Sequence, residues 1–492
     1  MILALLIIPA LAGLLAFGLP TPKARRALLL ITAAIHAGLT LACWRIAPQP
    51  ILRGWLALDE AGLWFLSITS LLFLAVAVYA AGYLASESNP RSTDLEEGFL
   101  FDNVPAAVFV GCLLLFLTAM TLVTVSQHFG LQWVAIEATT LASAPLVYFH
   151  RHPRSLEATW KYLLICSVGL ALALLANFFL AMAAAGNGPN SHSLMLSELV
   201  ARAGELQPAW LRAAFILFLV GYGTKMGLAP LHTWLPDAHS EAPSMVSALL
   251  SGALLNCAFL GIVRAQQICV AAGCDAFAGD LLVALGLLSL GVATIFIVGQ
   301  ADYKRMLAYS SVEHMGLLAL GTGLGGIGVL GAMLHAANHS LTKGLLFLTA
   351  GNILTRFKTK SAAHVSGLRQ VAPVTGVLWL TGFLAITGLP PFGIFLSKLT
   401  ILRAMFNGGH WWIATGTLLC LTLIFVGMAR VVLNMTLGEP PPTTASSSPP
   451  EQPWEIGPPL VLAVIVLLLG LAIPGPLNTL LTQMTTTLGG GR

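Results

Sequence analysis

Apolar stretches separated by short polar turns run along almost the whole chain. A hydrocarbon core about 30 Å thick requires about 20 apolar residues in each helix that crosses it. By that measure the chain contains about fourteen spans, predicted to begin near residues 2, 27, 56, 104, 129, 155, 209, 243, 277, 304, 327, 372, 411 and 457. The pattern predicts an all-α polytopic membrane protein with about 14 transmembrane helices.

The composition agrees with a chain whose solvent is lipid. Of its 492 residues 57% are hydrophobic and 9% charged, against roughly 45–50% and 25% in soluble domains. The net charge of +4 is too small to suggest nucleic-acid binding. The expected partners are therefore lipid and other membrane chains.

The cysteines give no sign of a cofactor. All but a few lie in apolar runs, and the sequence contains no CxxC or CxxCH motif, so neither an iron–sulfur cluster nor attached haem is indicated. We expect no cofactor and no metal in this chain. The seven cysteines are Cys43, Cys112, Cys166, Cys257, Cys269, Cys274 and Cys420.

Basic residues are about twice as frequent in the loops on one side of the predicted membrane as on the other. Loops rich in lysine and arginine face the cytoplasm, so both termini are expected outside it, in a bacterial or archaeal cytoplasmic membrane. The first segment has no positive region before its apolar run and is expected to be a retained helix. The residues on the basic side are Lys23, Arg25, Arg26, Arg91, Arg151, Arg154, Lys304, Arg305, Arg356, Lys358, Lys360 and Arg369.

Two loops are more polar than the others. Residues 86–103 carry the acidic cluster Asp94, Glu96 and Glu97, and residues 438–459 include the run PPPTTASSSPP. Such compositions are typical of solvated connectors and unstructured linkers. A docking surface for a soluble partner is the alternative for both.

Several ionisable residues lie inside the predicted spans. A charged side chain at mid-membrane costs about 2.5–3.5 kcal/mol even on the lenient insertion scale, so each is a functional candidate that should face a cavity. They are Glu137, Lys225, Glu313, His314, His335, His339, Lys343 and Lys398.

His335, His339 and Lys343 follow one another at intervals of four residues. On a helix of 3.6 residues per turn this spacing forms one stripe, and Asn338 and Thr342 flank it, where they could hold water. The stripe favours a proton relay. Histidines satisfied by backbone carbonyls, or a zinc site built on the HxxxH spacing, are the alternatives.

Two spans are interrupted by proline near a lysine. Pro230 follows Lys225, and Pro390 and Pro391 precede Lys398. Broken helices at membrane depth border protein or water, and paired breaks are typical of inverted repeats with sites at the midplane; prolines that merely kink core helices are the alternative. We predict an N-terminal three-helix segment (1–103), two inverted five-helix repeats of spans 4–8 (104–265) and 9–13 (277–437), a Pro/Ser-rich linker (438–456) and a C-terminal span (457–492).

A buried lysine beside a carboxylate can act as a switch. Burial favours the neutral lysine, whereas a carboxylate about 4 Å away favours the charged one by about 4 kcal/mol at an effective dielectric constant of 20. Glu137 and Lys225 have these ingredients. Lys398 lies on the helix that starts after the proline break. We expect the positive dipole end at the start of that helix to weaken the charged form of Lys398 further.

Three long motifs carry a family resemblance: GTKMGLAPLHTWLPDAHSEAPSMVSALLSG, HSLTKGLLFL and GLPPFGIFLSK. With them the chain resembles the antiporter-like subunits of complex I (NADH:quinone oxidoreductase), of multisubunit Na⁺/H⁺ antiporters and of membrane-bound hydrogenases. LQWVAIEATTLASAPL and SSVEHMGLLALG look most like the hydrogenase-4 or formate hydrogenlyase branch, similar to component F.

The resemblance implies a half-channel in each repeat and a hydrated polar axis along the membrane plane. It implies a glutamate–lysine pair at Glu137 and Lys225, a central relay at His335, His339 and Lys343, and a terminal lysine at Lys398. Asn256 stands where many relatives place a bridging lysine or histidine, and asparagine orders water without carrying the proton. Further candidates for the relay or its hydration are His239, Asn256, Glu313 and His314.

The sequence therefore favours a proton-translocating, non-catalytic subunit of a redox-driven complex. No redox cofactor motif occurs, so electron chemistry is expected in other subunits, namely a soluble [NiFe]-hydrogenase or dehydrogenase arm reached through further membrane subunits. A cation/proton antiporter without redox partners is one alternative. A structural membrane anchor is the other.

Overall fold

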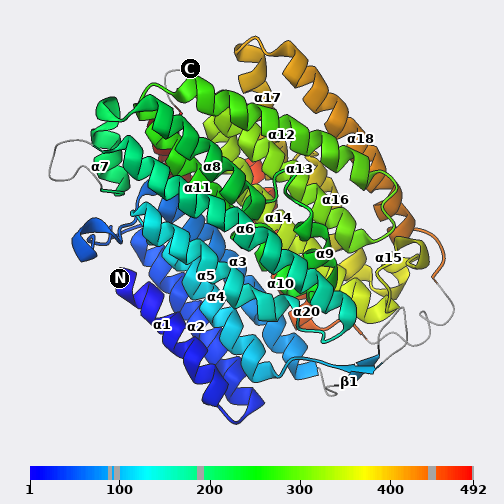
Figure 1. Ribbon diagram of the computed structural model, residues 1–492. Helices are drawn as coiled ribbons and strands as arrows, with labels where there is room; N and C mark the ends of the chain where they lie inside the picture. Colours follow the sequence, from blue (N-terminus) through cyan, green and yellow to red (C-terminus); the bar gives the residue numbers. More distant parts are fainter. Residues whose placement is uncertain (87–90, 94–99, 186–192, 441–449, 490–492) are drawn as a thin grey trace.

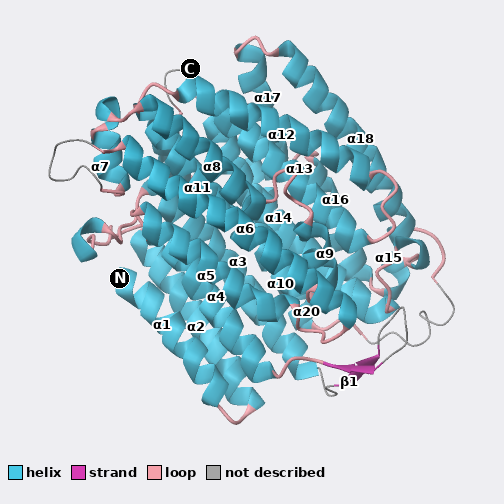
Figure 2. Cartoon of the chain, viewed as in Figure 1, coloured by secondary structure: helices cyan, strands magenta, loops and turns pink. Residues whose placement is uncertain are grey.

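The computed structural model describes residues 1–86, 91–93, 100–185, 193–440 and 450–489 (Figure 1). Almost all of this is helix, and the only strands within it are β1 (Arg91–Thr93) and β2 (Leu100–Asp102), an antiparallel pair (Figure 2). The acidic cluster Asp94, Glu96 and Glu97 lies outside the described residues. The predicted fold class, an all-α polytopic membrane protein, is confirmed.

The predicted spans correspond to helices that begin within a few residues of the expected positions. In chain order they are α1 (Ile2–Gly18), α2 (Pro22–Cys43), α3 (Glu60–Ser86), α4 (Ala106–Val125), α5 (Phe129–Val147), α6 (Pro153–Ala183), α8 (Pro208–Met226) with α9 (Trp234–Glu241), α10 (Ser244–Leu249) with α11 (Leu255–Ala271), α12 (Asp275–Ile297), α13 (Tyr303–Leu324), α14 (Ile327–Phe357), α16 (Pro373–Thr387) with α17 (Gly393–Asn407), α18 (Trp411–Thr436) and α20 (Pro453–Leu471). Short helices outside these spans are α7 (Leu196–Ala201), α15 (Leu368–Val371) and α21 (Gly475–Leu488). Short 3₁₀ turns are η1 (Leu52–Gly54), η2 (Ala203–Glu205) and η4 (Ala362–His364).

Both helix breaks occur where proline predicted them. α8 ends at Met226 and is followed by Gly227, which has φ 85°, and α9 begins only at Trp234. α16 ends at Thr387 and is followed by Gly388, which has φ 86°, and α17 begins at Gly393. Left-handed glycine ends a helix without strain, and the prolines that follow cannot continue it. The seventh and twelfth spans are thus broken helices, one in each five-helix unit. The residue boundaries of the two repeats stay a prediction.

The eighth span contains a wider turn that the sequence did not predict. The π-helical residues Leu250–Leu254 (η3) join α10 to α11. A π-turn inserts one extra residue per turn and commonly marks a functional site. Here it ends two residues before Asn256.

α14 lies in the interior of the bundle (Figure 1). It packs against α3, α10, α13, α16, α17, α20 and α21, and its side chains are buried without interruption from Gly331 to Ile353. A helix surrounded by protein can carry polar groups on every side without meeting lipid. The His335–His339–Lys343 stripe therefore occupies the centre of the fold.

The last span begins at Pro453, four residues before the predicted start at 457. The Glu455 carboxylate accepts a hydrogen bond from the Gln452 N–H (3.0 Å) and pairs with Arg356 (2.7 Å) on α14. These contacts start α20 earlier than its apolar run does. Residues 441–449 of the predicted linker lie outside the described part.

Two basic residues assigned to solvated loops are buried instead. Lys304 is 1% exposed and its Nζ donates to the carbonyls of Ser240 (3.0 Å) and Ala242 (2.6 Å) at the end of α9. Arg356 is 6% exposed and is held by Glu455. Both bind partners from other helices, which a count of charges along the chain cannot reveal.

Candidate functional site

Lys225 lies in the last turn of α8, immediately before the break. Its Nζ donates to Thr140 Oγ1 on α5 (2.8 Å) and to Tyr162 OH on α6 (2.6 Å), and it lies 4.4 Å from the centre of the Tyr162 ring. The side chain is fully buried. Lys225 is therefore enclosed by hydroxyl and aromatic groups that sequence reasoning did not identify.

Glu137 does not form an ion pair with Lys225. The Glu137 side chain is half-buried on α5; its Oε1 accepts a long hydrogen bond from Ser167 (3.4 Å), and its Oε2 has no partner among the described residues. No hydrogen bond joins the two side chains in the described structure, and the switch that they would form together stays a prediction. Thr140, three positions further along α5 and on the same side of that helix, makes the hydrogen bond with Lys225 instead.

Lys343 occupies the middle of α14. Its Nζ donates to the carbonyl of Leu307 and to Ser310 Oγ, both on α13 and both at 2.5 Å. No carboxylate in the described chain forms an ion pair with it, and the side chain is fully buried. It resembles Lys225 in having neutral oxygen partners only.

Histidines on α13 and α14 reach the second broken helix. His314 Nδ1 and His335 Nε2 are 2.8 Å apart, and His335 Nδ1 is 2.7 Å from Ser397 Oγ on α17. The rings of His314 and His339 have centroids 5.0 Å apart. The polar row formed by His335, His339 and Lys343 is thus continued by side chains of α13 and α17.

Lys398 pairs directly with a carboxylate. Its Nζ is 2.9 Å from Glu313 Oε1 and 3.3–3.4 Å from the carbonyls of Thr387 and Ile386 at the end of α16. A side chain at Gly388 would press on Lys398, since an added Cβ would lie 3.0 Å from its Cδ. Glycine there allows both the turn and the passage of the lysine.

The expected dipole effect on Lys398 is wrong in sign. The ammonium lies at the carboxyl end of α16, whose free carbonyls carry the negative end of the helix dipole. Those carbonyls and Glu313 stabilise the charged lysine. The long side chain reaches back across the break, which its position in the sequence does not show.

Asn256 follows the π-turn and faces α14. Its Nδ2 donates to Ser340 Oγ (2.8 Å) and to the Gly252 carbonyl (3.1 Å), whereas its Oδ1 is buried without a partner in the described structure. Ser251 Oγ lies 2.8 Å from Ser311 Oγ on α13. At this point of the row, between the two broken helices, the polar groups are the Asn256 amide and serine hydroxyls.

Several other polar atoms along this row are buried and lack protein partners within the described ranges. They are both ring nitrogens of His239 and of His339, Nε2 of His314, and both amide atoms of Asn338. Buried polar atoms in proteins are normally hydrogen-bonded, and bound water often satisfies them. His239 stacks on Phe347 at 5.0 Å. Among the described residues no group of three or more His, Cys, Asp and Glu is arranged to hold a metal ion.

A second polar network lies near the basic loops. Glu241 at the end of α9 pairs with Lys360 (2.9 Å) and lies 3.4 Å from His152, while Asp302 accepts from Ser240 (2.6 Å). Burial, with the nearby Lys304 and Lys360 charges, lowers the pKa of His150 in the α5–α6 loop to about 3. This histidine is neutral near pH 7. The network joins segments far apart in sequence, so no single motif predicted it.

Two further buried groups could have been found from the sequence. Arg264 on α11 pairs with Asp59 (2.8 Å) and donates to the Ser126 carbonyl; His36 on α2 lies 2.9 Å from both Ser70 Oγ and Thr121 Oγ1. Both residues stand in apolar runs. The argument that identified Lys225 and Lys398 applies equally to them.

Known proteins are similar to this chain in sequence and in fold. The chain is 37% identical over 350 residues to a hydrogenase-4 component F homolog of Methylacidiphilum infernorum (isolate V4), covering 71% of this chain and 72% of the relative. It is 31% identical over 386 residues to hydrogenase-4 component B of Escherichia coli (strain K12), covering 76% of this chain and 54% of the relative. The match thus spans only about half the length of the latter.

Solved structures match over nearly the whole chain. A chain of respiratory complex I from Thermus thermophilus with bound NADH has a TM-score of 0.82 at 25% identity, covering 100% of both chains. A chain of the archaeal membrane-bound sulfane sulfur reductase has a TM-score of 0.83 at 21% identity, covering 99% of this chain and 98% of that one, and shows the same fold.

A family model described as the transmembrane domain of NADH:quinone oxidoreductase and the Mrp antiporter matches residues 126–424. That stretch begins just before α5 and ends within α18, so it contains both broken helices and every residue predicted for the proton relay. The chain belongs to the NADH:quinone oxidoreductase/Mrp antiporter transmembrane family.

Proposed function

We propose that this chain is the proton-translocating membrane subunit of a redox-driven complex of the hydrogenase-4 or complex I kind. The observation that carries the proposal is the buried polar row from Lys225 on the first broken helix, past Asn256, Lys343 and the histidines, to Lys398 on the second. The sequence relationship to hydrogenase-4 components supports it. The membrane position of the chain and its place among other membrane subunits follow from the family.

The row contains two kinds of lysine site. Lys225 and Lys343 have neutral oxygen partners, whereas Lys398 pairs with Glu313. Burial favours a neutral lysine, and a nearby carboxylate favours a charged one. A proton that reaches Lys398 is therefore held by Glu313 until that carboxylate is neutralised or moves. Such a pair can bind a proton at one stage of a pumping cycle and release it at another.

Isolation of the intact complex tests the proposal. A tagged chain should copurify with other membrane subunits and with soluble iron–sulfur proteins, which include a nickel protein if the complex is a hydrogenase, all identified by mass spectrometry. In vesicles, electron transfer by the complex should drive proton uptake that an uncoupler abolishes. Copurification with antiporter subunits alone would favour the second candidate, a cation/proton antiporter. A chain of the Mrp complex from Dietzia sp. DQ12-45-1b has the same fold as this chain at 20% identity.

The orientation of the chain is testable by cysteine labelling. Because the basic loops belong in the cytoplasm, Gly204→Cys, in the exposed turn between α7 and α8, should react with a membrane-impermeant maleimide added outside intact cells. Ala363→Cys, exposed in the α14–α15 loop, should react only after the cells are broken. The unmodified chain is the control, since its cysteines are buried or, for Cys420, half-buried. The reverse pattern would contradict the proposed orientation.

Replacement of Glu313 should reduce proton uptake more than replacement of Glu137. Glu313→Gln removes the only described carboxylate in contact with Lys398, whereas Glu137→Gln removes a group to which Lys225 is not bonded. Loss of a partner from a buried ion pair costs about 3–5 kcal/mol. We therefore expect Glu313→Gln to reduce proton uptake in vesicles at least about tenfold, with a smaller loss for Glu137→Gln. Equal losses in the two variants would show that the contact between Glu313 and Lys398 does not decide how much a glutamate contributes to proton uptake.

Asn256 should serve as a hydrated link. Asn256→Leu keeps a similar volume but removes the amide that binds Ser340 and puts an apolar side chain at that point of the row. We expect proton uptake to fall several-fold in this variant, by about the value of one buried hydrogen bond, and to be better retained in Asn256→Lys. Similar uptake in the two variants would indicate that protons do not pass this position.

A further inference from the structure

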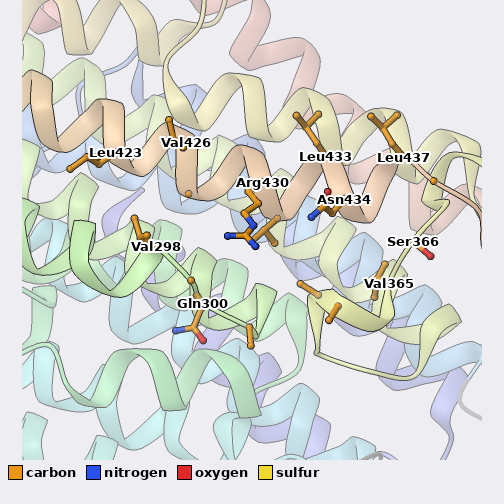
Figure 3. Close-up of a pocket in the computed structure, with 17 residues that line it drawn as sticks. Val298, Gln300, Val365, Ser366, Leu423, Val426, Arg430, Leu433, Asn434 and Leu437 are labelled. Atoms are coloured by element: carbon orange, nitrogen blue, oxygen red, sulfur yellow. The ribbon is translucent and has the colours of Figure 1, made fainter.

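A groove opens between α18 and the neighbouring segments at the end of the bundle that carries the basic loops (Figure 3). Its walls are α18, residues 298–301 after α12, and residues 362–366 before α15. Its volume is about 720 Å³. None of the residues proposed for proton transfer lines it, so the groove has no part in the polar row.

Arg430 extends from α18 into this groove, toward the segment that carries Gln300 (Figure 3). The side chain is exposed, and no described residue forms an ion pair or hydrogen bond with its guanidinium. Asn434 lies one helical turn further along the same face of α18 and lines the groove as well. The groove therefore holds an unpaired cation with two neutral amide side chains nearby.

Apolar side chains form the rest of the walls. Val298, Leu423, Val426, Leu433 and Leu437 all line the groove, and each is between 40% and 59% exposed. Water would be an unfavourable neighbour for so much apolar surface. A hydrocarbon chain is a favourable one.

The depth of Arg430 in the membrane fits a lipid phosphate. Arg430 lies six residues, or about 9 Å at 1.5 Å per residue, before the end of α18 at Thr436. At that depth an arginine reaches the headgroup region by extending its side chain. A guanidinium binds phosphate oxygens through two parallel hydrogen bonds, and the leaflet on the basic side of a membrane protein is the one that attracts positive charge.

We propose that this groove binds one anionic glycerophospholipid. Its phosphate accepts hydrogen bonds from Arg430 with Asn434 beside it, and an acyl chain lies along Val426 and Leu423 toward the middle of the membrane. The unpaired cation favours this occupant over an apolar helix of another subunit, which would cover the walls and leave the guanidinium without an anion. A lipid in this site would contact both the end of α12 and α18, the last helix of the second repeat.

Photolabelling of the intact complex tests the site. The complex is reconstituted in phosphatidylcholine vesicles that contain either phosphatidylglycerol or phosphatidylcholine with a photoactivatable acyl chain, and labelled peptides are mapped. We expect the α18 peptide to be labelled preferentially by phosphatidylglycerol. Arg430→Gln should reduce that labelling about tenfold, the value of a charged hydrogen-bonded contact.

The matched control is Arg403→Gln, which removes an exposed arginine from α17, the adjoining helix in sequence, and should leave the labelling of α18 unchanged. Millimolar inorganic phosphate should not displace the lipid. Equal labelling of the wild-type and Arg430→Gln complexes, or displacement by phosphate alone, would overturn the proposal. So would an unlabelled groove in which Val426→Cys forms a cross-link to a neighbouring subunit.

Discussion

Replacement of Lys398 by alanine is expected to reduce redox-driven proton uptake to background, a loss of about a hundredfold. Lys398 is the only lysine of the polar row that is paired with a carboxylate in the described structure. Without it Glu313 remains buried beside the free carbonyls of α16, at a cost of about 3–5 kcal/mol, and each 1.4 kcal/mol corresponds to a factor of ten in rate. The measurement is acidification of vesicles that contain the purified complex, with equal amounts of assembled complex in each sample.

Lys398→Arg separates charge from proton transfer. Arginine keeps the ion pair with Glu313 but does not lose its proton in proteins, so this variant should assemble as well as wild type and pump nearly as poorly as Lys398→Ala. Lys23→Ala, which removes an exposed lysine at the start of α2, is the control and should pump normally. An arginine variant with wild-type uptake would mean that Lys398 acts as a fixed charge.

Lys343→Met is expected to cause a loss of proton uptake of similar size while the complex still assembles. Methionine has nearly the length of lysine and fills the same buried space, and the lost partners, the Leu307 carbonyl and Ser310, are on one helix, where Ser310 can bond to the backbone. Folding is thus spared, but the protonatable lysine in the middle of the row is gone.

Lys358→Met makes the same change at an exposed position at the end of the same helix and should have little effect. Normal uptake in Lys343→Met would exclude this lysine from the path.

The sequence predicted which residues would be buried and ionisable, but not which of them would touch. Lys225, Lys343 and Lys398 stand out because a charge in lipid is costly, so a lysine within an apolar span indicates a polar site inside the protein. The proline breaks follow from backbone chemistry. Contacts between helices depend on how each helix is rotated. Glu137 and Lys225 are therefore not hydrogen-bonded in the described structure, whereas Lys398 and Glu313, 85 residues apart, form an ion pair.

The helical period was informative only within one helix. It placed His335, His339 and Lys343 on one stripe of α14, but the partners Ser397, His314 and Ser310 come from α17 and α13. The π-turn before Asn256 was also beyond prediction, because no sequence pattern in LSGAL marks a wider turn; these residues pack against α3 and α14.

The number of protons moved per electron transferred, measured in vesicles with the purified complex, tests the central claim most directly. The polar row is proposed to carry protons that electron transfer elsewhere in the complex drives. The ratio should therefore fall in Lys343→Met and in Lys398→Arg relative to wild type, at equal complex content and in the presence of the same electron donor. An unchanged ratio in both variants, with normal uptake, would contradict the claim that protons pass through this row.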